Sequence, residues 1–231
     1  MWQGMGDIFE HFESNPRVRT AVMTGAGGKA FVSGADISEF DKKRSSAAQR
    51  REYGKIAERG TRAMAHFSKP LIAMIDGYCI GGGLATALAA DVRFATPESS
   101  FGIPAAKLGL GYEYEGLAKL CGLVGPSRAR DIMLSARFFP TAEAQSMGLV
   151  NFSVEQSDLL AEVSHYAQRV ARNAPLTTLA AKAAVNAWER GGRDADIKEV
   201  KAMVDACFDS ADYKEGRAAF AAKRAPEFSG K

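Results

Sequence analysis

The feature that most constrains this chain is an apolar run, Leu71–Ile75, that leads shortly afterwards into three consecutive glycines at 81–83. The run lies between Pro70 and the dipeptide Asp76-Gly77. A short apolar run between such chain breaks is typical of a buried strand. The segment after the glycines is rich in alanine, which favours a helix. A buried strand followed by a glycine turn and a helix indicates an α/β protein.

The segments on either side of this strand continue the alternation of helix and strand. Apolar residues at helical spacing predict a helix from Trp2 to Phe12, and a β-rich run predicts a strand at 20–24. A long helix is expected to end before Lys69-Pro70, and Val92–Ala95 reads as the next strand.

The chain changes character after Pro126, where strand patterns give way to helical ones. Helices are predicted at 128–135, 159–172 and 176–190, and weaker helical patterns follow. We therefore expect an α/β core over residues 1–125 and a helical region over residues 126–231 that packs onto it.

Composition excludes several classes of protein. Lys and Arg number 30 against 27 Asp and Glu, a net charge of +3 that is too small to favour a nucleic-acid partner. The three cysteines form no CxxC pair and are odd in number, so neither a zinc site nor a disulfide framework is predicted. The first residues lack a signal-peptide pattern, and no apolar run is long enough to cross a bilayer. We expect a soluble, cytoplasmic protein with no membrane partner and no metal.

The glycines at 81–83 suggest a ligand site on physical grounds. Glycines at a helix start allow the backbone to approach a ligand, because no Cβ stands in the way. The first N–H groups of a helix have no partner within it and lie at the positive end of its dipole. Such N–H groups stabilise an anion or a developing oxyanion. The alternative is a helix start packed tightly against a neighbouring strand, with no ligand.

A second glycine-rich segment, at 24–37, follows the strand predicted at 20–24. Its spacing lacks the Gly-Lys-Ser/Thr of a phosphate-binding P-loop. It also lacks the third glycine and the distant acidic residue of a dinucleotide site. A nucleotide-binding fold is therefore not predicted.

These two segments, taken with later motifs, resemble the enoyl-CoA hydratase/isomerase (crotonase) superfamily. The resemblance spans nearly the whole chain in the order of the family. It is carried by Thr24-Gly25-x-Gly27, Ala30-Phe31-x-x-Gly34-Ala35-Asp36-Ile37, Lys69-Pro70, Asp76-Gly77-Tyr78, the glycines at 81–83, Phe101-Gly102-Ile103-Pro104, Leu108-Gly109, Met147-Gly148-Leu149-Val150, Asn173-Ala174-Pro175, Glu215-Gly216 and Lys223-Arg224-x-Pro226.

The resemblance implies a spiral of ββα units followed by helices that build trimers, often paired into hexamers. It also implies an acyl-CoA thioester as substrate, with no cofactor because coenzyme A is part of that substrate. The carbonyl oxygen of this thioester would be held by the backbone N–H groups of Ala35 and Gly82. The further residues expected to contact substrate or CoA are Ser33, Asp36, Ile37, Gly81, Tyr112, Phe220 and Lys223.

The chain departs from the family at both hydratase glutamates. Ala85 and Ala105 stand at those positions, and alanine can neither accept nor donate a proton. The acidic residues nearest to the site motifs are Glu113 and Glu115. Glu113 aligns with a catalytic aspartate of dienoyl-CoA isomerases and of other family members, and Tyr112 aligns with an active-site tyrosine of methylmalonyl-CoA decarboxylases. A carboxylate half-buried among tyrosines could have a raised pKa suited to proton transfer.

We therefore predict enolate chemistry of isomerase-like or atypical hydratase type, with Glu113 as the acid/base. The alternatives are an acyl-CoA decarboxylase or hydrolase, a catalytically inactive CoA-thioester binding protein, and a proton shuttle at Tyr112 or Glu115. Loop exposure of Glu113 would argue against its role.

Two further expectations concern the start of the chain and its assembly. Family members have a β-hairpin and a CoA-binding loop before the helix that begins here at Trp2, so we expect a truncated chain, a downstream start or a lost sheet edge. A family lysine is replaced by Ser38, which makes Lys223 the better CoA candidate. The helical region carries more apolar residues than a monomer core needs, which predicts a homotrimer or hexamer. Examples are Ile132, Met133, Leu179, Val185 and Trp188.

Overall fold

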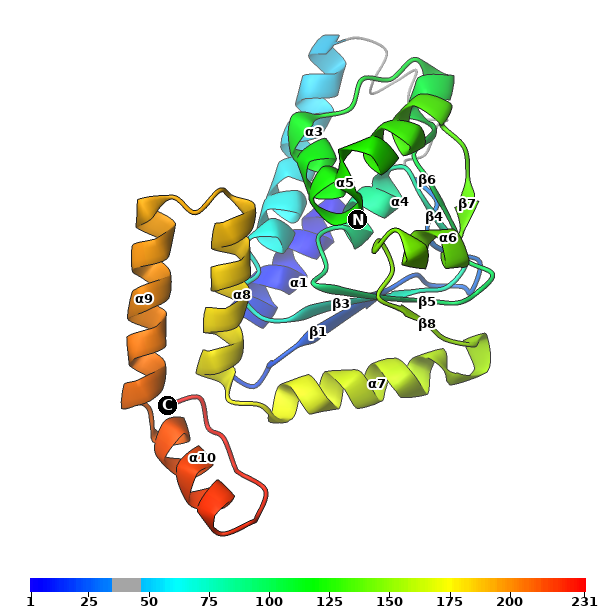
Figure 1. Ribbon diagram of the computed structural model, residues 1–231. Coiled ribbons are helices and arrows are strands. Elements are labelled where there is room, and N and C mark those ends of the chain that lie inside the picture. Colours follow the sequence, from blue (N-terminus) through cyan, green and yellow to red (C-terminus); the bar gives the residue numbers. More distant parts are fainter. Residues whose placement is uncertain (35–46) are drawn as a thin grey trace.

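The computed structural model describes residues 1–34 and 47–231 and shows two packed sheets with helices around them (Figure 1). One sheet has the strand order β1-β3-β5-β8 and the other β2-β4-β6-β7. All pairs are parallel except β6 with β7. The strands are β1 (Ala21–Thr24), β2 (Ala30–Val32), β3 (Leu71–Ile75), β4 (Tyr78–Ile80), β5 (Val92–Ala95), β6 (Ser100–Gly102), β7 (Phe139–Pro140) and β8 (Phe152–Ser153).

The chain visits the two sheets in alternation, because β1, β3 and β5 are each followed directly by a strand of the other sheet. A helical segment follows each such pair, which confirms the expected α/β class built from ββα units. The helices are α1 (Trp2–Ser14), α3 (Ala47–Ala65), α4 (Gly82–Ala87), the 3₁₀ helix η2 (Pro104–Leu108), α5 (Tyr114–Ser135), α6 (Thr141–Ser146), α7 (Gln156–Arg172), α8 (Pro175–Glu189), α9 (Asp194–Asp209) and α10 (Ala211–Ala221).

Strand β3 is apolar along its whole length because both of its faces are buried. Leu71, Ala73 and Ile75 enter the main core with Leu84, whereas Ile72 packs in a separate cluster against α7. The sequence prediction of Leu71–Ile75 as a strand is confirmed, as is that of Val92–Ala95.

Helix α4 ends earlier than the alanine-rich sequence indicates. Residues after Ala87 take part in tertiary hydrogen bonds instead: the Ala90 carbonyl accepts one from the buried Arg93 guanidinium at 2.6 Å. The Asp91 carboxylate accepts another from the Leu71 N–H at 2.7 Å. The dipole expected from a long helix at Gly82 is therefore that of a six-residue helix only.

Helix α5 consists of two helical segments that meet at Gly125, whose φ of 79° and ψ of 158° are not helical. The segment after Gly125 begins at Pro126 and ends at Ser135, which agrees with the helix predicted at 128–135, whereas the segment that begins at Tyr114 was not predicted. Beyond residue 126, β7 and β8 still join the two sheets as edge strands, and the helices α7 to α10 follow. In Figure 1, α8 and α9 lie side by side as a hairpin, and α10 extends from its lower end.

The glycine at 83 allows α4 to pack against β2. A Cβ built at Gly83 would lie 1.9 Å from the Val32 carbonyl oxygen, far inside contact distance. The tight-packing interpretation of the glycine cluster is thus correct for this residue. The contact of Gly83 with Val32 joins two segments, β2 and α4, that lie far apart in the sequence.

We expect Gly83→Ala to lower the free energy of unfolding by about 3 kcal/mol, because neither the helix backbone nor the strand carbonyl can yield cheaply. Gly122→Ala is the matched control. It lies inside α5, and a Cβ there would meet no described atom within 4 Å, so helix propensity should raise stability by about 0.5–1 kcal/mol. Urea denaturation measures both, and equal stability of the two variants would contradict the packing argument.

Candidate active site

The three glycines at 81–83 have three different roles. Gly81 lies at φ 56° and ψ −117°, a backbone conformation that side chains disfavour, and its N–H donates to the Gly102 carbonyl at 2.8 Å. Gly83 packs on β2. Gly82 is exposed, and a Cβ built there would meet no described atom within 4 Å. A Cβ at Gly81 would also meet no described atom within 4 Å, but Gly82 is the only one of the three that is exposed.

The Gly82 N–H is available to a ligand in the described part of the chain. It belongs to the first residue of α4, where an N–H has no partner within the helix. The first bond along this turn runs from the Ala85 N–H to the Gly81 carbonyl, at 3.1 Å. Among the residues that the structure describes, none accepts a hydrogen bond from the Gly82 N–H. Of the N–H groups that precede this first bond, that of Gly82 belongs to the one exposed residue, because Gly83 and Leu84 are buried.

The second expected donor, Ala35, lies outside the described residues, as do Asp36 and Ile37. The described neighbours approach the Gly82 turn. Gly34 has φ 110°, and a Cβ there would lie 3.6 Å from the carbonyl oxygen of Ile80, which immediately precedes Gly81. Ser33 is exposed. A shared oxygen between the Ala35 and Gly82 amides stays a prediction.

The two positions at which the resemblance implies hydratase glutamates hold alanines. Ala85 is half-buried in α4, and Ala105 is only 6% exposed within the main core. The Ala105 carbonyl accepts a hydrogen bond from the Leu110 N–H at 3.0 Å. Neither side chain can carry a proton, so acid/base chemistry at this site needs another group.

Of the three candidates near residue 113, the structure brings Tyr112 to the turn. Its ring packs against the main core, and its hydroxyl donates to the Gly81 carbonyl at 3.4 Å. Burial raises the pKa of the Tyr112 hydroxyl above its usual value. Glu113 is an exposed residue that immediately precedes α5, and its carbonyl accepts from the Leu117 N–H. Glu115 is exposed in the first turn of α5.

Sequence reasoning missed Gly116, which makes room for Tyr112. A Cβ at Gly116 would lie 3.2 Å from Cε1 of the Tyr112 ring. Gly116 lies in the first turn of α5, where glycine weakens a helix by about 1 kcal/mol relative to alanine. A glycine at such a position, close to a tyrosine, was the available signal.

The residues expected to contact CoA from the C-terminal region lie on α10 and just beyond it. Phe220 is 88% exposed, and Lys223 is exposed in the following turn, at φ 52°. In Figure 1, α10 extends from α9 at the far end of the molecule from α4. Within one chain these two residues therefore do not join the Gly82 turn.

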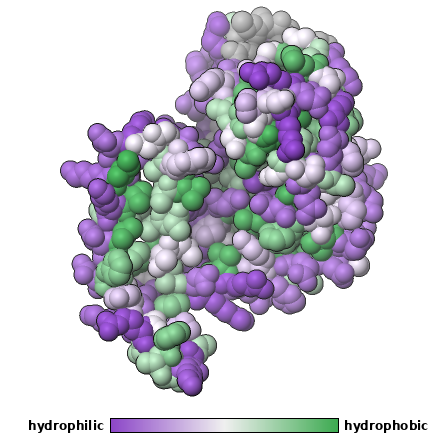
Figure 2. Space-filling model, in the orientation of Figure 1, coloured by the Kyte–Doolittle hydropathy of each residue, from purple (hydrophilic) through white to green (hydrophobic). Residues whose placement is uncertain are grey.

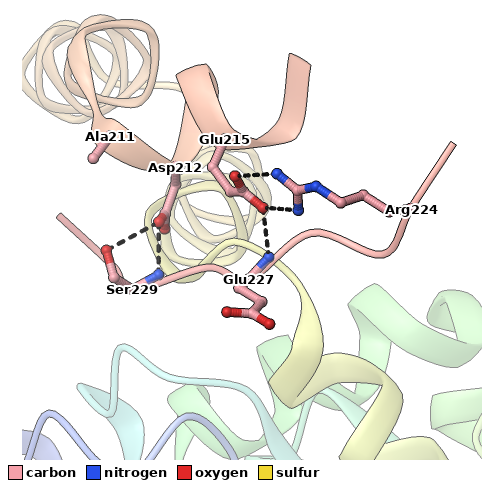
Figure 3. Close-up of a pocket in the computed structure, with 6 residues that line it drawn as sticks. All are labelled: Ala211, Asp212, Glu215, Arg224, Glu227 and Ser229. Carbon is pink, nitrogen blue, oxygen red and sulfur yellow. Dashed lines mark hydrogen bonds and ion pairs between the residues drawn. The ribbon is translucent and has the colours of Figure 1, made fainter. Parts of the chain in front are cut away.

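A pocket at the C-terminal tail is lined by one ion pair and by hydrogen bonds between α10 and the tail (Figure 3). Glu215 binds the Arg224 guanidinium through both oxygens, at 2.6 and 2.8 Å, and also accepts from the Glu227 N–H, which together lower its pKa to about 2. Asp212 accepts from the Ser229 N–H at 2.7 Å. Arg19 donates to the Phe228 carbonyl and so ties the tail to the core. These charges fasten the tail to α10 rather than form an acyl-CoA site.

Neither a metal centre nor a bilayer-spanning element emerges from residues 1–34 and 47–231. No group of three or more His, Cys, Asp or Glu side chains in this part of the chain could hold a metal ion. No helix described there combines the length and the apolar character needed to cross a bilayer.

Comparisons with known proteins point to one family. A family model described as enoyl-CoA hydratase/isomerase matches residues 1–231. The chain is 35% identical over 229 residues to a crotonyl-CoA hydratase of Syntrophomonas wolfei, covering 97% of this chain and 86% of the relative. It is 32% identical over 220 residues to a short-chain-enoyl-CoA hydratase of Clostridium acetobutylicum, covering 95% and 84%. It is 32% identical over 231 residues to a carnitinyl-CoA dehydratase of Salmonella typhi, covering 98% and 87%.

Solved structures agree with this result and show the fold expected from the resemblance. A crystal structure of an enoyl-CoA hydratase/carnithine racemase from Magnetospirillum magneticum superimposes with a TM-score of 0.93 at 35% identity, covering 100% of this chain and 86% of the other. A crystal structure of an enoyl-CoA hydratase/isomerase family protein from Hyphomonas neptunium superimposes with a TM-score of 0.93 at 32% identity, covering 100% of this chain and 88% of the other.

Proposed function

The chain belongs to the enoyl-CoA hydratase/isomerase family and is an enzyme of it, and we propose that it holds the carbonyl oxygen of an acyl-CoA thioester as that carbonyl becomes an enolate. The observation that carries the proposal is the N–H of the exposed Gly82, which begins α4 and has no hydrogen-bond acceptor among the described residues. The relatives named above carry enoyl-CoA, crotonyl-CoA and carnitinyl-CoA in their names, which supports a thioester of this type.

The proposed mechanism depends on backbone donors. Removing a proton next to a thioester places negative charge on the carbonyl oxygen. The N–H groups of Gly82 and Ala35 would donate to that oxygen, and a preorganised donor of this kind contributes about 10²–10³ in rate. No cofactor is required, because coenzyme A arrives as part of the substrate.

We propose Glu113 as the group that moves the proton. Ala85 and Ala105 remove the two glutamates expected of a hydratase, so the reaction is isomerase-like or an atypical hydration. Glu113 directly follows Tyr112, whose hydroxyl reaches the Gly81 carbonyl, so the backbone at 113 lies about one tyrosine side chain away from the turn. Decarboxylation or hydrolysis of an acyl-CoA is the second candidate, favoured by the exposure of Glu113 and by the two alanines. A CoA-thioester binding protein without turnover is the third.

Replacing Gly82 by proline removes the proposed donor and puts the ring carbon Cδ in place of its hydrogen. Proline is well tolerated at the first position of a helix, where its missing N–H has no helical partner. We expect Gly82→Pro to lower kcat about 10²–10³-fold relative to Gly82→Ala, which keeps the N–H. Kinetics on a panel of enoyl-, dienoyl- and malonyl-type CoA thioesters measures this, with the melting temperature of each variant as the check on folding. Equal kcat for the two variants would remove Gly82 from the mechanism.

The role of Glu113 is tested by Glu113→Gln, which keeps the shape of the side chain and removes its proton transfer. We expect kcat to fall by about 10²–10⁴-fold on the true substrate, with the affinity for a CoA ester nearly unchanged. Glu115→Gln, two residues further on, is the matched control and should retain turnover. Full turnover in Glu113→Gln would shift the assignment to decarboxylation, hydrolysis or binding.

We also propose that the enzyme assembles as a trimer or a pair of trimers. Ile132 is fully buried in the core, so its use as an interface residue was wrong, but Val185 and Trp188 on α8 are 58% and 76% exposed. Apolar residues continue along α9 and α10, where Figure 2 shows them gathered on one face. The exposed members are Ile197, Val204, Phe208, Tyr213 and Phe220. A neighbouring copy would cover this face and could receive Phe220 and Lys223 near its own site.

We expect light scattering at micromolar concentration to give three or six times the chain mass of 24.7 kDa. Trp188→Lys should reduce that mass and weaken acyl-CoA binding together, because it places a charge in the contact. Leu160→Lys, on the exposed face of α7, is the control and should do neither. A wild-type protein that stays a single chain would contradict the proposal.

A further inference from the structure

We infer that Tyr112 is a positioning residue whose hydroxyl holds the Gly81–Gly82 peptide and thereby sets the direction of the Gly82 N–H. The inference rests on the role proposed above for Gly82. It assigns to Tyr112 an effect through the peptide backbone rather than a contact with the substrate.

The geometry follows from one peptide plane. The carbonyl of Gly81 and the N–H of Gly82 belong to the same trans peptide, so they point in opposite directions and turn together. The carbonyl accepts from two donors, the Ala85 N–H at 3.1 Å and the Tyr112 hydroxyl at 3.4 Å. A group that fixes this carbonyl therefore also aims the N–H on the other side.

This peptide needs such a restraint more than most. It joins two glycines, the residues that restrict backbone rotation least. Among the described residues, the one other donor to its carbonyl is the Ala85 N–H, which makes the first bond of a six-residue helix. Rotation of the peptide would turn the Gly82 N–H away from the oxygen without unfolding anything. A second donor on the carbonyl limits that rotation.

The placement of Tyr112 fits this role. Its ring packs against the main core and lies next to Gly116, which has no side chain to displace it. Burial raises the pKa of the Tyr112 hydroxyl, so the hydroxyl remains protonated, and therefore a donor, at neutral pH and well above. The distance of 3.4 Å is longer than that of a strong O–H···O bond. Negative charge on an oxygen bound to Gly82 would polarise the peptide and strengthen the bond on its carbonyl side. The hydroxyl thus contributes most when the enolate is present.

The carbonyl of a bound thioester reports this effect directly. The probe is butanoyl-CoA labelled with ¹³C at the thioester carbonyl, and the measurement is its infrared stretching frequency in the complex. We expect the wild-type enzyme to lower this frequency relative to free butanoyl-CoA, and Tyr112→Phe to lose a clear part of that shift. In turnover, kcat should fall about 3–10-fold in Tyr112→Phe while KM stays within about twofold.

Tyr114→Phe is the matched control, because it removes the same hydroxyl from a side chain that is 78% exposed, and it should match the wild type. An unshifted frequency in the wild-type complex would overturn the role of Gly82 itself. A wild-type shift that Tyr112→Phe retains in full would overturn the role of Tyr112 alone. A Tyr112→Phe enzyme with a changed KM and the same carbonyl frequency as the wild type would indicate that Tyr112 contacts the substrate, and it would also overturn the positioning role.

Gly116→Ala gives a second test that keeps the hydroxyl. Its methyl group would lie 3.2 Å from a Tyr112 ring carbon, so the ring must move by a few tenths of an ångström. We expect a smaller loss of the carbonyl shift in the same direction, while thermal stability holds or rises because alanine favours the helix. If Tyr112→Phe does not fold, an unchanged frequency in Gly116→Ala overturns the proposal.

Discussion

The absence of a side chain at Gly83 is the constraint on which the site depends. Only hydrogen there lets the first turn of α4 press against the Val32 carbonyl at the end of β2. That contact brings together segments near residues 34 and 82, which no local interaction could join. Parallel pairing of β2 with β4 supports it, because both strands run toward the same edge and release their loops there. The arrangement of backbone amides proposed for the site therefore depends first on the packing at Gly83.

The same core is linked to the helical region by a small network of charged and polar groups. The Lys182 ammonium, on α8, donates to the Lys69 carbonyl at 2.9 Å and to the Asp91 carboxylate at 2.8 Å, and Asp91 in turn accepts from the N–H of Leu71. The Lys182 side chain is only 12% exposed, so water screens this ion pair less than it screens one at the open surface. The network fixes both ends of the β3–α4 unit relative to α8. A helix that carries exposed Trp188 is therefore connected physically to the strand that leads into Gly82.

The sequence predicted what depends on local patterning and missed what depends on tertiary contacts. Leu71–Ile75 was recognisable because a strand buried on both faces has to be apolar throughout. The length of α4 was not, because Ala90 and Asp91 satisfy Arg93 and the start of β3 instead of continuing the helix. Gly82 could be chosen as a candidate donor from its motif alone, because a backbone N–H that approaches a ligand favours glycine at that position. The exposure of Glu113 and the link from Tyr112 to Gly81 depend on how the chain turns after Gly109, where no periodic pattern exists.

The proposed chemistry has two parts, stabilisation of the enolate oxygen and transfer of a proton, and different groups would perform them. Backbone amides stabilise charge on a thioester oxygen whatever side chains surround them, so the loss of glutamates at Ala85 and Ala105 leaves that capacity intact. Proton transfer, in contrast, requires a particular side chain at a particular distance. In this chain the segment from Ala105 to Gly116 contains a buried methyl group, a half-buried tyrosine and an exposed carboxylate. Under the proposed function, the backbone donors would stabilise the enolate, and the side chains of this segment would determine how a proton reaches or leaves it.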